Sequence, residues 1–331
     1  MQFLSDNAAL VHPRVWEAMR EADAVTMPYD GDEASRALDA RFADLFGRDC
    51  AVLWAATGTA ANCLALSAMC PPHGGVLCHR EAHIETDEGG APGFYLHGAK
   101  LMLVDGEGAK IAAEALATHA DTIRPDVHQV QPHAVSITQA SEYGRVYRPA
   151  EIAEIAELCR SRGWAFHMDG ARFANAAAFL GRDAKAAADG VDALTFGCVK
   201  NGGLGAEAIV LFDTCLADLV RIRRKRAGHL QSKGRYLAAQ IHAMLDDDLW
   251  LDNAEAANAV AALIAGGAQD RLLHPVEANE VFLHCTAAER ERLREQGFGF
   301  YDWGEDAARF VTAWTAREED GERLAAAIAA L

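Results

Sequence analysis

Lys200 is the residue whose surroundings most strongly suggest chemistry in this sequence. It stands in the segment TFGCVKNGGLGAEAIVLF, between a short apolar run and a glycine-rich turn. Lysine is costly to remove from water, so a lysine at the end of a buried strand needs a reason. An amine with a depressed pKa can condense with a carbonyl group, and the glycines would let the backbone approach a flat ligand. The alternative is a turn lysine that points into solvent.

A carboxylate and an arginine follow a second apolar run, in WAFHMDGARFANAAAFL. The pattern predicts a strand that ends at Asp169 and a helix that begins just after Arg172. Ligands gather at this edge of parallel sheets, although a carboxylate there can also cap the helix. An enzyme that uses pyridoxal phosphate needs an acid at the pyridine nitrogen, so that the ring can accept electrons. Asp169 and Lys200, at the ends of neighbouring predicted strands, meet this requirement better than helix capping does.

Two further segments fit the same cofactor. In ATGTAANCLALSAM a predicted strand runs into Gly58 and Thr59 at the start of a helix, where free backbone N–H groups bind phosphate. A threonine that caps the helix is the ordinary alternative. In REAHIETDEGG, His83 could stack on the cofactor ring and transfer protons, or it could be a surface histidine. A phosphate turn, an acid and a lysine in this order are far more specific together than any one of them alone.

Seven short apolar runs are expected to form the strands that position these residues. They mostly alternate with helical stretches such as TAANCLALSAM and PAEIAEIAELCRSR, which predicts an α/β fold with a mostly parallel sheet covered on both faces. The link CVKNGGLGAE between the last two runs is too short for a crossover helix, so these two strands are expected to be antiparallel. The runs start at residues 51, 75, 100, 133, 164, 193 and 208.

The character of the sequence changes near residue 246, which predicts two domains. Residues 1–245 are expected to form a large cofactor-binding domain that includes the N-terminal segment, and residues 246–331 a smaller C-terminal α+β domain. The second part contains a helical stretch, the run EVFLHC, another helical stretch, the run RFVTAW and a terminal helix. This order is similar to that of a βαβ unit.

Composition disfavours several classes of protein. The chain has 331 residues, 51% of them hydrophobic, which is enough for a sizeable core. A net charge of −17 disfavours nucleic acid and anionic membranes as partners, and no apolar stretch approaches the length of a membrane span. The eight cysteines include no C-x-x-C pair and the first residues do not resemble a signal peptide, so we expect a cytoplasmic protein. The basic segment 221–226 is either a solvated helix face or a contact for an anion or an acidic subunit.

These segments together resemble the threonine aldolase family, in the β-eliminating lyase group of fold-type-I pyridoxal-phosphate enzymes, over nearly the whole chain. The similarity is greatest to the bacterial low-specificity type, which also cleaves phenylserine. The resemblance implies the PLP-dependent transferase-like fold, pyridoxal 5'-phosphate as cofactor and no metal. It implies reversible cleavage of L-threonine, L-allo-threonine and related L-β-hydroxy-α-amino acids to glycine and an aldehyde. The expected assembly is a homotetramer, a dimer of dimers with active sites at a subunit interface.

The resemblance also implies which residues contact the cofactor. Lys200 would form the Schiff base, although the usual S-K-G sequence reads V-K-N here. Asp169 would face the pyridine nitrogen, and His83 would stack on the ring. Gly58 and Thr59 would bind the phosphate.

The substrate carboxylate is assigned in the same way to three residues. Ser5 belongs to the segment S-D-N near the N-terminus, together with Asp6 and Asn7. Arg172 belongs to the motif H-x-D-G-A-R and would lie near the ring hydroxyl as well as the substrate. Arg309, in ARFVTAW, matches the C-terminal arginine that binds this carboxylate in relatives.

Two histidines and the basic segment complete the implied site. His128, in DVH, matches a histidine associated with the substrate hydroxyl, and either it or His83 would be the base. In relatives a neighbouring subunit supplies a phosphate contact. The arginine that makes this contact in relatives aligns with Ser232 in this sequence. Arg226 or Lys233 would therefore have to supply the phosphate contact.

Alternatives to an aldolase remain open. Enzymes that carry out β-elimination, racemisation or transamination share the fold and the lysine, and the fold does not separate them. A non-catalytic binding protein that keeps the fold is a further possibility.

Overall fold

The seven predicted strands form one sheet. The computed structural model describes residues 1–331, apart from the Gln269 side chain. Within the described residues the strand order is β1-β7-β6-β5-β4-β2-β3. The strands are β1 (Ala51–Ala55), β2 (Gly75–His79), β3 (Lys100–Val104), β4 (Pro132–Thr138), β5 (Ala165–Gly170), β6 (Ala193–Phe196) and β7 (Glu207–Leu211).

The sheet is parallel except at β7, which runs antiparallel to both β6 and β1. The antiparallel pairing of β6 with β7 confirms the prediction from the short link between them. That link holds one turn of 3₁₀ helix, η4 (Val199–Asn201), which ends at Gly202 with φ of 114°. Glycine adopts this left-handed conformation without the steric cost of a Cβ atom. The tight turn places Lys200 directly beyond the end of β6.

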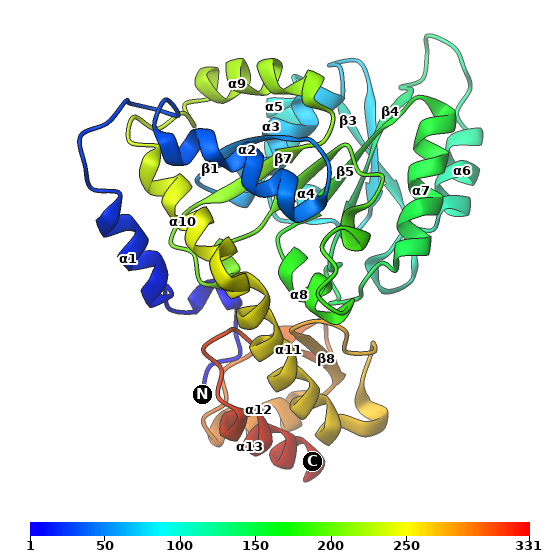
Figure 1. The fold of residues 1–331 in the computed structure, drawn as a ribbon. Coiled ribbons are helices and arrows are strands. Elements are labelled where there is room, and N and C mark those ends of the chain that lie inside the picture. The colour runs from blue at the N-terminus through cyan, green and yellow to red at the C-terminus, as the bar shows by residue number, and fades with distance from the viewer.

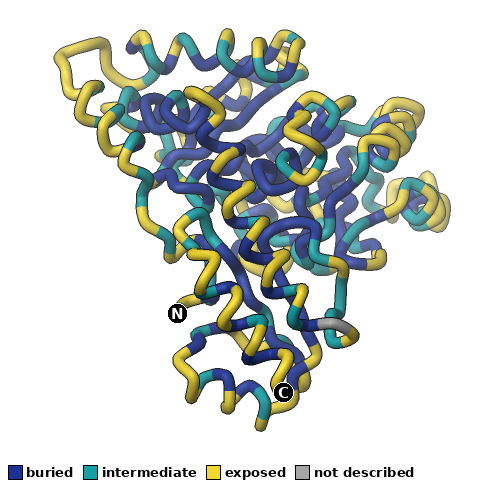
Figure 2. Tube along the Cα trace, turned by 60° about the horizontal axis from the view of Figure 1, so that its bottom comes forward, coloured by how far each residue is buried: buried dark blue, intermediate teal, exposed yellow. Residues whose placement is uncertain are grey.

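Helices cover both faces of the sheet, as Figure 1 shows. In β1, Val52 and Trp54 pack in one hydrophobic cluster while Leu53 packs in the other, because successive side chains of a strand point to opposite faces. One face carries α1 (Pro13–Glu21), α2 (Glu33–Phe46), α6 (Ala113–Asp121), α7 (Pro149–Arg162), α8 (Phe173–Phe179) and α10 (Arg235–Leu245). The other carries α3 (Gly58–Met69), α4 (His83–Thr86), α5 (Ala91–Tyr95) and α9 (Ala217–Arg226). In Figure 2 buried residues gather in the middle of the molecule and exposed residues lie mostly toward its outside.

The C-terminal part forms a second sheet, in which the predicted βαβ arrangement is wrong. Its strands run in the order β8-β10-β9, and β10 is antiparallel to both neighbours. After β8 and α12 the chain enters the short strand β9, which was not predicted, and a turn at Gly304 returns it along β8. The elements are α11 (Leu249–Ala268), β8 (Glu280–His284), α12 (Ala287–Glu295), β9 (Tyr301–Trp303), β10 (Ala307–Val311) and α13 (Glu318–Ala329).

The N-terminus joins this second sheet. Phe3 is buried in its hydrophobic cluster, and Gln2 forms a bridge with Gly299. Both chain ends therefore lie in the lower part of Figure 1. The proposed domain boundary near residue 246 stays a prediction, and it falls just before α11. Among the described residues, no helix has the length and apolar character needed to cross a bilayer.

Candidate active site

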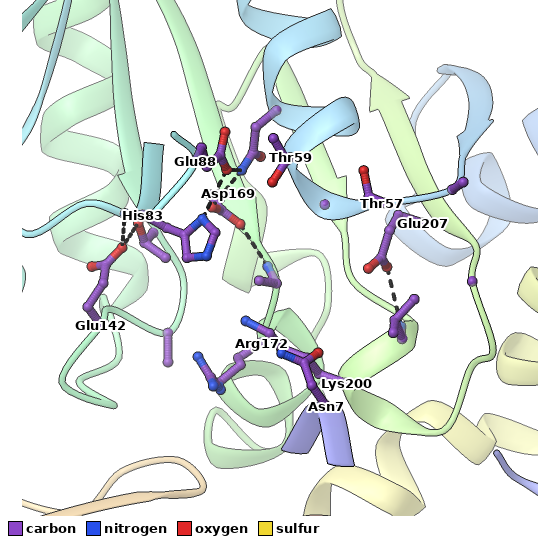
Figure 3. A pocket seen from close by; sticks show the side chains of 18 of the residues that line it. Asn7, Thr57, Thr59, His83, Glu88, Glu142, Asp169, Arg172, Lys200 and Glu207 are labelled. Atoms are coloured by element: carbon purple, nitrogen blue, oxygen red, sulfur yellow. Dashed lines mark hydrogen bonds and ion pairs between the residues drawn. The ribbon is translucent and has the colours of Figure 1, made fainter. Parts of the chain in front are cut away.

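A cavity of about 410 Å³ opens at the edge of the large sheet where several strands end. Gly58 and Thr59 follow β1, Asp169 lies at the end of β5, and Lys200 follows β6. All four line this cavity, and so does His83, which follows β2 (Figure 3). Because the carboxyl ends of parallel strands meet at one edge, segments far apart in the sequence deliver their polar groups to one place.

Lys200 lines the cavity from the turn η4. Burial lowers the pKa of its ammonium group, and the nearby charge of Arg172 lowers it further, while the carboxylates of Asp6 and Asp169 oppose the shift. A lysine with a lowered pKa has a larger neutral fraction, which is the form that attacks a carbonyl carbon. The solvent-exposed turn lysine is therefore the wrong alternative.

Asp169 is buried and hydrogen-bonded through both carboxylate oxygens. Its Oδ1 accepts from the backbone N–H of Ala171 at 2.9 Å, and its Oδ2 accepts from Asn62 Nδ2 at 2.8 Å. It does not cap α8, whose N-cap residue is Arg172. The carboxylate is thus held in place at the cavity wall, where it can bind a protonated ring nitrogen.

A second buried carboxylate, Glu88, connects this arrangement to His83. Glu88 Oε1 lies 3.0 Å from His83 Nδ1 and accepts from Asn62 Nδ2 at 3.0 Å. The hydrogen bond to Glu88 raises the pKa of His83, although burial opposes the change. Donor atoms of His83, Glu88 and Asp169 lie within 4.8 Å of one another, a spacing that could also hold a metal ion. The Asn62 amide donates to both carboxylates and links them.

The turn before α3 is compatible with both roles that the sequence suggested. Thr57 caps the helix, since its side chain accepts from Ala60 N at 3.1 Å. Gly58 and Thr59 form the first turn, where backbone N–H groups have no partner within the helix. Capping and phosphate binding are therefore compatible here, because they use different atoms.

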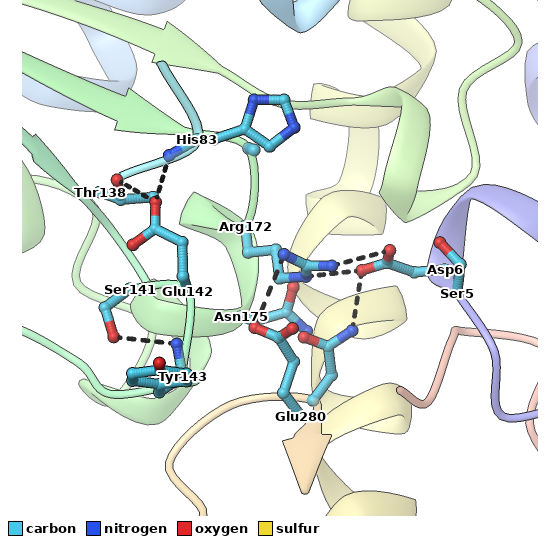
Figure 4. A network of polar contacts seen from close by, with 12 residues as sticks. Ser5, Asp6, His83, Thr138, Ser141, Glu142, Tyr143, Arg172, Asn175 and Glu280 are labelled. Carbon is cyan, nitrogen blue, oxygen red and sulfur yellow. Dashed lines mark hydrogen bonds and ion pairs between the residues drawn. The ribbon is translucent and has the colours of Figure 1, made fainter. Parts of the chain in front are cut away.

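Arg172 lies at the centre of a buried chain of charges, shown in Figure 4. Its Nε and Nη2 donate to Asp6 at 2.8 and 3.1 Å, and its Nη1 lies 3.6 Å from Glu280 Oε2. Burial disfavours charge on Asp6, but Arg172 and Lys200 outweigh it and lower the pKa of Asp6. Burial also opposes charge on Arg172, yet Asp6 and Glu280 raise its pKa. The arginine is therefore permanently charged and rigidly oriented at the cavity wall.

Two of the residues assigned to the substrate carboxylate lie behind this wall. Arg309 Nη2 donates to Glu280 Oε1 at 2.7 Å, so Glu280 stands between Arg309 and Arg172. Ser5 caps the short helix η1 (Asp6–Ala8), and its Oγ accepts from Asn7 N at 3.2 Å. Ser5 borders a different hollow, whereas Asn7 of the same segment lines the cavity.

His128 is not part of the site of its own chain. It is exposed in the loop before β4, where its backbone N–H donates to Asp126 Oδ1 at 2.9 Å. That loop precedes Pro132, whereas the cavity lies beyond Thr138 at the other end of β4. A strand of this length separates the two ends by roughly 20 Å, at about 3.3 Å per residue. The order along the chain explains this position, because a loop that precedes a parallel strand lies at the edge opposite to the carboxyl ends of the strands.

The basic segment likewise lies away from the cavity of its own chain. Arg226 borders a hollow beside Phe94, and Lys233 forms a backbone bridge with Tyr29. Arg224 is buried and pairs with Asp30. The helix α9 is therefore only partly a solvated basic face.

Four side chains of the site were not predicted from the sequence. Asn62 and Glu88 bind Asp169 and His83, and two further buried carboxyl groups, Glu142 and Glu207, line the cavity. Burial raises the pKa of Glu142 and of Glu207 to about 7 each. Glu207 left one signal, a lone acid at the start of the apolar run EAIVLF. Asn62 lies one helical turn after Gly58, on the same face of α3.

Comparison with known proteins places the chain in a family. The sequence model of the family described as beta-eliminating lyase matches residues 2–288. Two low specificity L-threonine aldolases, of Pseudomonas sp. (strain NCIMB 10558) and of Pseudomonas aeruginosa, are 42% and 44% identical to this chain. Those alignments cover 100% and 98% of this chain and 97% and 94% of the two relatives. A solved threonine aldolase from Leishmania major has the same fold, with a TM-score of 0.92, 24% identity and coverage of 99% and 98% of the two chains. The chain therefore belongs to the β-eliminating lyase family and, within it, to the low-specificity L-threonine aldolases.

Proposed function

We propose that this protein is a pyridoxal-phosphate-dependent aldolase. It reversibly cleaves L-threonine, L-allo-threonine and related L-β-hydroxy-α-amino acids, such as phenylserine, to glycine and an aldehyde. The observation that carries this proposal is that Lys200 and Asp169 line one cavity, beside His83 and the first turn of α3. The names of the two Pseudomonas relatives support it.

The polar groups around the cavity suit pyridoxal phosphate. Lys200 would bind the carbonyl carbon of the cofactor, and Asp169, held by Asn62, would keep a proton on the ring nitrogen. The N–H groups of Gly58 and Thr59 would bind the phosphate. When bound, this cofactor accepts the electron pair released by cleavage of the Cα–Cβ bond.

The substrate carboxylate would bind at Arg172, which lines the cavity. Arg309 shares Glu280 with Arg172, so an incoming carboxylate would compete with Glu280 for the two guanidinium groups. Ser5 would contribute from the segment that also holds Asp6. A fixed carboxylate keeps the Cα–Cβ bond perpendicular to the ring, and this alignment decides which bond breaks.

His83 would stack on the ring and take the proton of the β-hydroxyl group. If its Nδ1–H donates to Glu88, Nε2 is the acceptor that a base requires. His128 could take part only from a second copy of the chain, because its own cavity lies at the opposite edge of the sheet.

Product analysis separates this proposal from the other reactions of the fold. The purified protein with cofactor should convert threonine to glycine and acetaldehyde. Assays with allo-threonine, phenylserine and β-hydroxyaspartate would define the preferred side chain. Formation of 2-oxobutanoate would instead indicate elimination. Formation of D-allo-threonine, which differs from L-threonine only at Cα, would indicate racemisation. Borohydride reduces a Schiff base and should remove its absorbance. A colourless protein whose absorbance does not change with borohydride would contradict the cofactor assignment itself.

Replacing Lys200 tests the central assignment. Lys200→Ala should abolish turnover while the protein stays folded, because the amine supplies chemistry and not core packing. Aldehyde release measures turnover, and circular dichroism shows whether the protein is folded. Lys185→Ala, at an exposed position, is the matched control and should keep full activity. Substantial activity of Lys200→Ala would refute the assignment.

We further propose a homotetramer, a dimer of dimers, in the cytoplasm. Large apolar side chains are exposed on separate parts of the surface, among them Val25, Met27 and Phe94, whose exposed fractions are 106%, 63% and 79%. All eight cysteines are free, which suits a reducing compartment. Sedimentation velocity of the complete chain would test the assembly.

A further inference from the structure

Glu207 occupies an unusual position for an acid, between the phosphate turn and the lysine segment. It is the first residue of β7, and it pairs in register with Ala55, the last residue of β1. Three residues after Ala55 comes Gly58 at the start of α3. On the other side of β7 lies β6, which leads into Lys200. The backbone thus places this carboxyl group beside both segments, and Figure 3 shows it next to Thr57.

One oxygen of Glu207 is used within the protein. Its Oε2 accepts from the backbone N–H groups of Cys198 and Val199, at 2.5 and 3.4 Å. The side chain is buried to 7% exposure but lines the cavity, and its other oxygen is directed into it (Figure 3). One oxygen therefore fixes the lysine segment, while the other remains available to a ligand.

Burial of Glu207 favours its neutral form. Burial raises its pKa to about 7, and Asp169 adds to the rise, while the two backbone N–H groups and Lys200 oppose it. Cys198, whose backbone N–H donates to Glu207, has a thiol with a pKa raised well above its usual value, so this thiol stays neutral. A phosphate group would add further negative charge nearby and so raise the pKa of Glu207 again.

The phosphate end of the cavity needs hydrogen-bond donors. Among the described residues that line the cavity, the basic side chains are Arg172, Lys200 and His83. Arg172 is bound to Asp6, and His83 to Glu88. Val199, next to the lysine, has no polar side-chain atom. An ionised Glu207 would repel a phosphate dianion, whereas a neutral carboxylic acid can donate to it.

We propose that Glu207 binds the phosphate of pyridoxal phosphate as a neutral carboxylic acid, whose O–H group donates to a phosphate oxygen. Its second oxygen meanwhile holds the backbone of Cys198 and Val199, which links the phosphate contact to the position of Lys200. Binding therefore takes up a proton when the free carboxyl group is ionised. This inference rests on the cofactor site and not on the identity of the substrate.

The test compares Glu207→Gln and Glu207→Ala with the unchanged protein. The Gln side chain keeps a neutral donor and an acceptor but does not titrate. Dissociation constants for pyridoxal phosphate and for pyridoxal, which lacks the phosphate, are measured by absorbance between pH 6 and 9. At pH 6.5 the Gln variant should bind pyridoxal phosphate as tightly as the unchanged protein. The Ala variant should bind about tenfold more weakly or worse, because a hydrogen bond to a charged group is lost.

The decisive quantity is the ratio of the dissociation constants of the unchanged protein and the Gln variant. Titration of the phosphate, of Lys200 and of His83 affects both proteins and cancels. Above pH 7 the ratio should rise by up to about tenfold per pH unit, since only the unchanged protein must take up a proton. With pyridoxal the ratio should stay constant.

Three outcomes would overturn the proposal. A ratio that does not change with pH would limit Glu207 to holding the backbone. A Gln variant that binds more weakly at high pH would show an ionised Glu207 paired with a cation, for instance from a neighbouring subunit. If the ratio measured with pyridoxal changed with pH in the same way, the phosphate would be excluded as the group that Glu207 binds. Failure of the unchanged protein to bind either compound would instead refute the cofactor site.

Discussion

The carboxyl groups of the site differ in charge because their neighbours differ. Asp6 is buried, but it faces the guanidinium of Arg172, and its pKa is lowered. Glu142 and Glu207 have no such arginine partner, and burial raises the pKa of each carboxyl group to about 7. At neutral pH Asp6, beside Arg172, is therefore held in its ionised form, whereas Glu142 and Glu207, which line the cavity, can carry a proton. The residue types alone do not distinguish these roles.

Replacing Asp169 by asparagine tests the proton on the ring nitrogen. Asp169→Asn should lower turnover by orders of magnitude, because a neutral amide does not stabilise a protonated pyridine nitrogen. The Asn62 amide would also face a second amide in place of a carboxylate oxygen. Cofactor binding, followed by absorbance, should survive through Lys200. Turnover of threonine near the unchanged rate would show that the carboxylate is only structural.

The pH dependence of turnover should report the contact between Glu88 and His83. The hydrogen bond to Glu88 raises the pKa of His83, and a base must be unprotonated to act. Glu88→Gln removes the charge, so the pKa of His83 falls and the acid limb of the kcat/KM profile moves to lower pH. Glu85→Gln, at an exposed position of the short helix α4 that contains His83, should leave the acid limb in place. An acid limb unmoved by Glu88→Gln would exclude His83 as the base.

At the scale of elements, the sequence predicted what depends on local pattern. All seven strands of the large sheet were found from short apolar runs, and a link too short for a helix predicted the antiparallel pair β6 and β7. The strand β9 was missed, because three mostly exposed residues leave no apolar pattern. Contacts between distant segments were missed as well. Arg172 and Asp6 are 166 residues apart, and nothing near either residue indicates that they pair.

Packing of α11 against α13 supports the second sheet, and two adjacent glycines test it. A Cβ atom at Gly267 would lie 2.2 Å from the backbone oxygen of Ala325 in α13. Gly267→Ala should therefore cost about 1–3 kcal/mol of stability, because the helices must move apart. A Cβ atom at Gly266 would meet nothing within 4 Å, so Gly266→Ala should stabilise the helix by about 0.5–1 kcal/mol. Urea-unfolding midpoints measure both. If Gly267→Ala did not lower the stability relative to Gly266→Ala, the close packing of α11 against α13 would be contradicted.

At the scale of the whole molecule, one chain does not contain the complete proposed site. The cavity lies at the carboxyl edge of the sheet, while His128 and the exposed Val127 lie in the loop at the opposite edge, which Figure 1 shows at the upper right, before β4. The chain carries a net charge of −17, yet α9 alone contains five basic residues. A second copy could bring both the histidine loop and this basic helix to an acidic surface. Assembly would then complete the site as well as cover apolar side chains.

Mixed oligomers test whether His128 acts across a subunit boundary. His128→Ala should lower activity, and Lys200→Ala should abolish it. If His128 serves the cavity of a neighbouring chain, then refolding the two variants together creates sites with an intact Lys200 from one chain and an intact His128 from the other. Random pairing in symmetric dimers predicts recovery of about a quarter of the unchanged activity. The matched control is a mixture of Lys200→Ala with Asp169→Asn. Both residues line the same cavity of one chain, so pairing these two variants cannot create an intact site. Recovery equal to that of the control would place His128 outside the reaction or require its loop to reach the cavity of its own chain.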